Sequence, residues 1–149
     1  VTTIFNPAPA VEFPDSVYPL CDYFTPNETE AADLAGIPVT NVDEAREAAK
    51  IFQDRGVKTA LITLGEMGCY FMNESGEGHV PAFDMSGKVV ETTGAGDGFN
   101  GGFAAALAEG KSPDEAIRYG SATAAISVTR LGTAPAMPQR SEIEQLVNS

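Results

Sequence analysis

The sequence of 149 residues has little of several residue types, and each shortage narrows the possible functions. Nine lysines and arginines stand against 21 aspartates and glutamates, so the net charge is −12. Such an acidic chain repels nucleic acid and anionic membranes, and we expect neither as a partner. No apolar run approaches the roughly 18 residues that a membrane-spanning helix needs, so no membrane span is expected.

Cysteine and histidine are also scarce. Cys21 and Cys69 are the only cysteines, and their spacing matches no metal site. We therefore expect free thiols in a reducing, cytoplasmic setting, while one disulfide is left open. His79 is the only histidine; its sequence setting indicates exposure, and we assign it no role. The sequence has no G-x-x-x-x-G-K-[ST] loop, which argues against a P-loop nucleotide enzyme.

What remains is a globular composition, with 43% apolar and 20% charged residues. The length suits one domain with a real core. Because the overall field is negative, a phosphate ligand would have to be bound by local amides, a divalent cation or an arginine. The chain starts inside a β-type segment, from Val1 to Phe5, and we expect it to be a fragment of a longer protein.

Strand-like and helix-like stretches alternate along the chain. Strands are predicted at 1–5, 22–24, 59–63 and 69–72, with a turn at 73–78, an edge segment at 79–83 and an extended run at 88–93. Helices are predicted at about 27–35, 41–54 and 97–109, from 112, and from 141, with a short helix or turn at 14–20. This alternation predicts an α/β fold, a three-layer αβα sandwich with a mostly parallel sheet, as a single domain over 1–149. Ligands of such sheets bind beyond the carboxyl ends of the strands.

Polar caps mark the predicted helix starts. For the first main helix, Thr25 with Glu28 has capping-box spacing, and Asn27 is the alternative cap. From the residues alone, ordinary capping is the favoured interpretation of the polar side chains there, including Glu30. Ser112 begins a full helix start, and Ser141 has the same spacing in the last helix.

The most informative stretch runs from Glu91 to Gly102. An extended run enters a Gly-Ala-Gly turn, Asp97 follows, and an apolar helical pattern begins. Backbone N–H groups at a helix N-terminus would hold an anion, and Asp97 would take a proton from an attacking hydroxyl. That combination suits phosphoryl transfer. A plain strand-to-helix turn is the usual interpretation of such a short motif, but the density of glycine here favours either close packing or close approach of a ligand.

Five blocks of the sequence resemble the ribokinase, or phosphofructokinase-B, family of sugar kinases. The segment 92–99 is similar to the second signature of that family. The segments similar to ribokinases in particular are 6–10, 25–31, 61–65 and 125–132. Together the blocks cover the whole chain in order.

The resemblance implies a role for residues in each block. Asp97 matches the catalytic base that deprotonates the sugar hydroxyl. The anion hole for the transferred phosphoryl group matches the backbone amides of Gly94, Ala95, Gly96 and Asp97. Asn27 and Glu30 match an Asn-x-x-Glu element that organises phosphates and the water ligands of Mg²⁺.

The nucleotide and a monovalent cation are assigned in the same way. Ser121 falls where the family has an adenine-pocket residue, and the loop along ATP matches Thr63, Leu64, Gly65, Glu66 and Gly68. K⁺ ligands of the family fall on Glu91, Thr93, Ser127, Arg130, Gly132 and Ala136. Glu91 and Ala136 depart from the usual aspartate and hydroxyl residue, which leaves K⁺ activation open.

The resemblance implies that this chain corresponds to the C-terminal half of an enzyme. In the family, the sugar site and a lid with the homodimer contacts come from an N-terminal half, so we expect this chain alone to be inactive on sugar. The activity implied for the complete protein is Mg²⁺-dependent transfer of the ATP γ-phosphoryl group to a sugar. D-Ribose is the favoured sugar, and the product is then ribose 5-phosphate. Two alternatives are a sister kinase acting on fructose, 2-keto-3-deoxygluconate or a nucleoside, and a nucleotide-binding module without catalysis.

Overall fold

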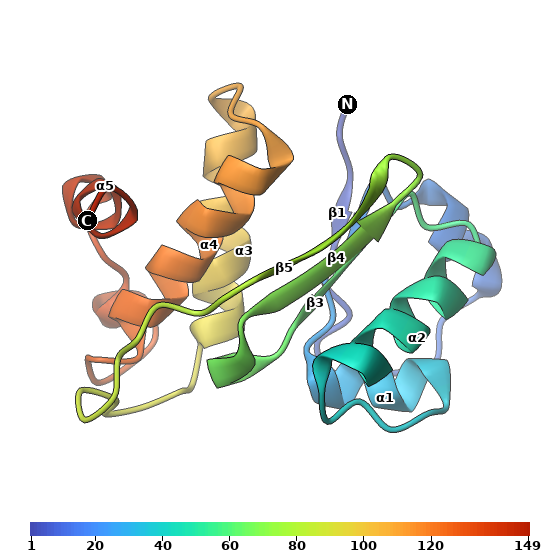
Figure 1. Ribbon diagram of the computed structural model, residues 1–149, viewed down its shortest axis with the longest axis horizontal. Helices are drawn as coiled ribbons and strands as arrows, with labels where there is room; N and C mark the ends of the chain where they lie inside the picture. Colours follow the sequence, from blue (N-terminus) through green and yellow to red (C-terminus); the bar gives the residue numbers. More distant parts are fainter. The chain divides into compact units, whose positions relative to one another are not determined.

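The computed structural model describes residues 1–149 without gaps. The chain divides into two compact units, Val1–Pro81 and Ala82–Ser149. Figure 1 shows the elements of both, and each unit is described by itself. The expectation of a single domain stays a prediction.

The first unit is built on a five-stranded sheet in the order β1-β2-β3-β4-β5. The strands are β1 (Ile4–Phe5), β2 (Tyr23–Phe24), β3 (Thr59–Thr63), β4 (Cys69–Asn73) and β5 (Gly76–Val80). β1, β2 and β3 pair in parallel, whereas β4 is antiparallel to both of its neighbours. β5 therefore points the same way as the first three strands. This confirms the α/β class and the mostly parallel direction of the sheet.

Two helices, α1 (Glu28–Ala35) and α2 (Val42–Asp54), pack against this sheet on one face (Figure 1). A stripe on α2 is fully buried, and it consists of Ala45, Ala48, Ala49 and Phe52. The alanines let the helix approach the sheet closely, and Phe52 meets Phe24 of β2 with ring centroids 4.9 Å apart. Short 3₁₀ turns, η1 (Asp15–Leu20) and η2 (Gly65–Met67), complete the unit.

The cap of α1 is Asn27 and not Thr25. Asn27 Oδ1 accepts the N–H of Glu30 at 2.8 Å, and Glu30 Oε2 accepts the N–H of Asn27 at 2.9 Å. Thr25 lies too early to cap the helix, because the chain stays extended past it: the Thr25 N–H pairs with the Phe5 carbonyl at 3.0 Å, the Pro26 carbonyl accepts the N–H of Thr63, and the helix begins at Glu28. Gly36 ends the helix in the left-handed conformation, with φ of 72°.

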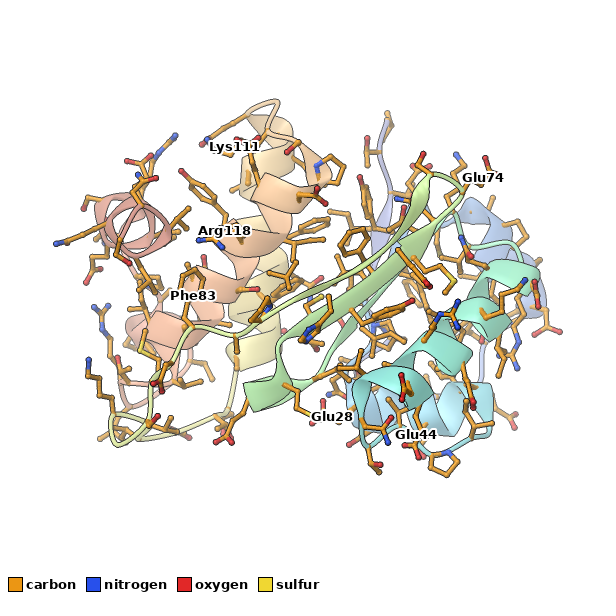
Figure 2. The ribbon with its side chains drawn as sticks, in the orientation of Figure 1. Glu28, Glu44, Glu74, Phe83, Lys111 and Arg118 are labelled. Atoms are coloured by element: carbon orange, nitrogen blue, oxygen red, sulfur yellow. The ribbon has the colours of Figure 1, made fainter.

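The second unit consists of helices α3 (Ala95–Ala108), α4 (Pro113–Ser127) and α5 (Arg140–Val147), with a 3₁₀ turn η3 (Ala134–Ala136). α3 and α4 pack with almost no space between their backbones. A Cβ added to Gly102 of α3 would lie 2.2 Å from Thr123 Oγ1, and one added to Gly120 of α4 would lie 2.8 Å from the Phe99 carbonyl. Gly102 and Gly120 therefore serve helix packing. Figure 2 shows Arg118 of α4 beside Phe83, with its guanidinium 5.4 Å from the ring centroid.

Three predicted boundaries were wrong. Residues 88–93 form no strand, because the N–H groups of Val90 and Glu91 both donate to one acceptor, the Val128 carbonyl, instead of forming a ladder. The predicted turn 73–78 is shorter, and the last sheet strand begins at Gly76 and ends before Pro81, which has no N–H to donate. The last helix begins at Arg140 after the N-cap Gln139, two residues before the predicted cap Ser141, and the Gln139 N–H donates to Glu142 Oε2 at 2.7 Å.

Candidate functional site

The Gly-Ala-Gly turn opens α3 without a side-chain cap. Gly94 stands at the N-cap position with φ of 82°, a left-handed conformation that suits glycine. The Ala95 N–H bonds the Thr92 carbonyl at 3.2 Å, while the N–H groups of Gly96 and Asp97 have no acceptor in the chain. Since first-turn N–H groups carry the positive end of the helix dipole, this turn can bind an anion.

Asp97 is the third residue of α3 and lies beside these amides. Its carboxylate is exposed and makes no hydrogen bond or ion pair with the chain. Asn100, one turn later, donates from Nδ2 to the Gly96 carbonyl at 2.9 Å. An exposed acceptor next to unbonded amides can take a proton while the amides stabilise negative charge.

The loop after α4 contacts the segment that leads into this turn. Glu91 Oε2 accepts the N–H of Gly132 at 2.9 Å, and a Cβ on Gly94 would lie 3.1 Å from Thr133 Cγ2. The structure thus brings together two of the residues assigned to the cation, Glu91 and Gly132. Thr93 is exposed in the turn itself.

The other residues assigned to the cation have different neighbours. Ser127 is buried and donates from Oγ to the Ala124 carbonyl at 2.8 Å. Arg130 pairs with Glu142 of α5, and the guanidinium holds the pKa of that carboxyl below its usual range. Ala136 is buried in η3. Ser121, the residue assigned to the adenine, is half-buried in the middle of α4.

In the first unit, the assigned residues lie where β2 and β3 end. Asn27 and Thr63 form a parallel bridge, and the Thr63 N–H donates to the Pro26 carbonyl at 3.1 Å. Glu28, labelled in Figure 2, begins α1, and its Oε1 would lie 3.9 Å from a Cβ on Gly65. This edge therefore gathers the Asn-x-x-Glu element and the start of the loop after β3.

The loop between β3 and β4 holds the remaining assigned residues, Leu64, Gly65, Glu66 and Gly68. Gly65 and Gly68 have φ of 57° and 92°, and Glu66 is exposed. Nε2 of His79, on β5, forms a hydrogen bond with the Met67 carbonyl. The sequence offered no signal for this contact, because it depends on the register of the β4–β5 pairing.

The assigned residues thus form two groups, one in each compact unit. The first group is Asn27, Glu30 and Thr63–Gly68, and the second group is the α3 turn with Glu91, Ser121 and the loop after α4. Neither unit contains a cluster of three or more histidine, cysteine, aspartate or glutamate side chains arranged for a metal ion. Cys21 and Cys69 are buried and form no disulfide. None of the helices combines the length and the apolarity that crossing a membrane requires.

The sequence matches the pfkB family of carbohydrate kinases over residues 1–140. The chain belongs to this family. It is 45% identical to a ribokinase of Haemophilus influenzae over 142 residues, covering 95% of this chain and 46% of the relative. It is 37% identical to a deoxyribokinase of Salmonella typhi over 149 residues, covering 99% and 48%.

A solved structure agrees with the sequence relatives. The chain superposes on an Arabidopsis thaliana ribokinase complexed with ribose and ATP with a TM-score of 0.93 at 31% identity, covering 100% of this chain and 48% of that one. The chain therefore spans about half the length of the relatives that it matches.

Proposed function

We propose that the complete protein is an ATP-dependent sugar kinase that converts D-ribose to ribose 5-phosphate, and that this chain supplies its catalytic base and its nucleotide site. The observation that carries the proposal is the uncapped turn of α3, with two N–H groups lacking acceptors and the Asp97 carboxylate beside them. Family membership and the ribose and ATP bound by the Arabidopsis thaliana relative support it.

In the proposed reaction, the Asp97 carboxylate accepts the proton of the sugar 5-hydroxyl. The oxygen attacks the γ-phosphorus of ATP, a new O–P bond forms, and the bond to the β-phosphate oxygen breaks to release ADP. The amides of the α3 turn stabilise the negative charge of the transferred group. Because these donors are fixed by the helix, they need no reorganisation during the reaction.

Mg²⁺ is the proposed metal, with Asn27 and Glu30 beside it. Glu30 Oε2 is engaged by the Asn27 N–H, which leaves Oε1 free to hold a water ligand of the ion. Such an arrangement fits a cation that prefers oxygen ligands and keeps several waters. When bound, the ion would neutralise charge on the ATP phosphates, while the capping box holds Glu30 in one orientation.

Thr63–Gly68 and Ser121 are the proposed contacts of ATP along the loop after β3 and on α4. The small molecules ATP and sugar are the proposed partners, and the cytoplasm, which supplies ATP and keeps thiols reduced, is the proposed location. K⁺ is a further proposed ligand near Glu91. One carboxylate oxygen of Glu91 bonds Gly132, and the second remains available.

A second sugar is favoured by a specific observation. The Salmonella typhi relative is a deoxyribokinase, and the match to it covers 99% of this chain and 48% of the relative. 2-Deoxyribose is therefore the alternative substrate to test first, ahead of fructose.

An assay of ADP release by the complete protein tests the proposal. With Mg²⁺ and ATP, we expect ribose to give the highest kcat/KM among ribose, 2-deoxyribose and fructose. The 149-residue chain should bind ATP with Mg²⁺ in a thermal-shift measurement and release no sugar-dependent ADP. Nucleotide stabilisation of the complete protein with no turnover on any sugar would favour a binding module and overturn the kinase proposal.

A further inference from the structure

The loop between β3 and β4 is the proposed nucleotide loop, and its own hydrogen bonds are few. Leu64 N–H donates to the Gly68 carbonyl at 2.8 Å, Met67 N–H to Leu64 at 3.1 Å, and Gly68 N–H to Gly65 at 3.0 Å. All three bonds are internal to the loop. They close it on itself but do not fix it against the rest of the sheet.

Glycine makes this loop conformationally free. Gly65 and Gly68 both have positive φ, and glycine has more accessible backbone conformations than any other residue. Gly65, Glu66 and Met67 are exposed, so packing restrains them little. Leu64 is buried and Thr63 pairs with Cys69, which fixes both ends of the loop. A contact from outside the loop would restrain its exposed part, 65–67.

His79 provides that contact from a well-fixed position. The β4–β5 ladder runs from Cys69 opposite Val80 to Asn73 opposite Gly76, and it begins directly after the loop. His79 stands opposite Tyr70, and its ring reaches back to the Met67 carbonyl. A strand that is otherwise outside the proposed site thus touches the loop through one side chain.

The hydrogen-bonding groups of His79 and Met67 determine which of the two donates. A carbonyl oxygen only accepts hydrogen bonds, so Nε2 must carry the proton. Both the imidazolium and the Nε2–H tautomer of neutral imidazole can donate there. The bond is therefore compatible with either charge state of the ring.

We propose that His79 is a positioning residue for ATP, which holds the Met67 carbonyl and so fixes the loop 64–68 in the shape that receives the nucleotide. This inference rests on the proposed function, because it takes the loop as the nucleotide loop. His79 acts through the loop and touches neither sugar nor the transferred group. Its removal should therefore weaken ATP binding and leave the chemical step nearly intact.

Two variants and a matched control test the role in the complete protein. His79→Ala removes the donor, whereas His79→Gln keeps an N–H that can reach a carbonyl. Glu74→Ala is the control, because Glu74 is exposed at the opposite end of the same hairpin (Figure 2). KM for ATP, KM for ribose, kcat and the melting temperature are measured for each.

For His79→Ala we expect KM for ATP to rise about three- to tenfold, the range for the loss of one hydrogen bond. KM for ribose and kcat should stay within about twofold, and His79→Gln should recover part of the loss. Amide hydrogen exchange without ligand should accelerate in 64–68 for His79→Ala and stay unchanged for Glu74→Ala. A purely structural role would instead lower the melting temperature and change both KM values together.

The outcomes separate the two proposals. If the wild-type protein phosphorylates sugar and His79→Ala keeps its KM for ATP, the positioning role is wrong and the kinase stands. If the wild-type protein shows no turnover, the same variants are compared by their Kd for ATP with Mg²⁺, and an unchanged Kd overturns the positioning role. If ATP does not bind at all, both proposals fall.

Discussion

The Glu91 carboxylate accepts a hydrogen bond from the backbone N–H of Gly132, a residue 41 positions later in the chain. This bond joins the segment before the α3 turn to the loop after α4. The N–H groups of Val90 and Glu91 reinforce the link, because both donate to the Val128 carbonyl. The α3 turn is therefore held in place by a loop that lies far away in the sequence.

Removal of the Glu91 acceptor should loosen the turn. We expect Glu91→Ala to destabilise the protein by about 1–2 kcal/mol, because the Gly132 N–H loses its partner, and to lower kcat. Glu91→Gln keeps an oxygen at this position and should retain most of the stability, as measured by urea unfolding.

The same pair of variants tests the proposed K⁺ site. If a carboxylate charge beside Gly132 holds the cation, Glu91→Gln should lose any stimulation by KCl relative to choline chloride while keeping its fold. Equal stimulation of the wild type and of Glu91→Gln would exclude Glu91 as a K⁺ ligand.

Asp97 offers the most direct test of the proposed chemistry. Asp97→Asn keeps the size of the side chain but removes the base, so kcat should fall about 10²–10⁴-fold with a smaller change in KM. Asp114→Asn is the matched control, since Asp114 is an exposed acid in the first turn of α4. Near-normal turnover of Asp97→Asn would show that another group takes the proton.

Two neighbouring glycines of α3 should respond in opposite ways to alanine. A Cβ on Gly102 would clash with Thr123, so Gly102→Ala should cost about 1–3 kcal/mol of stability. A Cβ on Gly101 meets nothing within 4 Å, and Gly101→Ala should stabilise the helix by up to about 1 kcal/mol. The midpoints of urea unfolding report both changes, and a loss of stability in Gly101→Ala would contradict this packing.

Acid stability should depend on Asp22. Hydrogen bonds from the Lys58 ammonium and the Thr3 N–H lower the pKa of Asp22 to about 2. A carboxyl whose pKa is lower in the folded state stabilises the protein above its unfolded pKa of about 3.9, and that contribution is lost as the pH falls toward 2. The stability difference between wild type and Asp22→Asn should therefore be present at pH 7 and shrink between about pH 4 and pH 2. A difference that stays constant over this range would mean that the ion pair contributes nothing.

Local signals in the sequence predicted much of the fold. The helix predicted at 41–54 and the cap at Ser112 depend on residues within a few positions of each other, and the structure has both. The cap at Asn27 was left as one of two alternatives, because Thr25 has equivalent spacing. The parallel sheet decides between them, because its pairing keeps the chain extended as far as Asn27.

Features that depend on distant partners could not be predicted. Val89 and Val90 have high strand propensity, yet 88–93 forms no strand because its N–H groups meet a single carbonyl from after α4. The contact of His79 with Met67 follows from a ladder register that no local pattern specifies. The motif at Gly94–Asp97 was recognisable because its residues lie in an unbroken run.

The missing cap of α3 has a thermodynamic consequence. In α4 the Ser112 side chain accepts the N–H of Glu115, whereas α3 has no side-chain cap and leaves the N–H groups of Gly96 and Asp97 without an acceptor. A bound phosphate would serve as the cap of this helix, so the hydrogen bonds that complete the fold and those that hold the ligand are the same bonds. Binding of phosphate at the turn should therefore raise the melting temperature of the second unit. This increase should become smaller as salt ions compete for the N-terminus of α3.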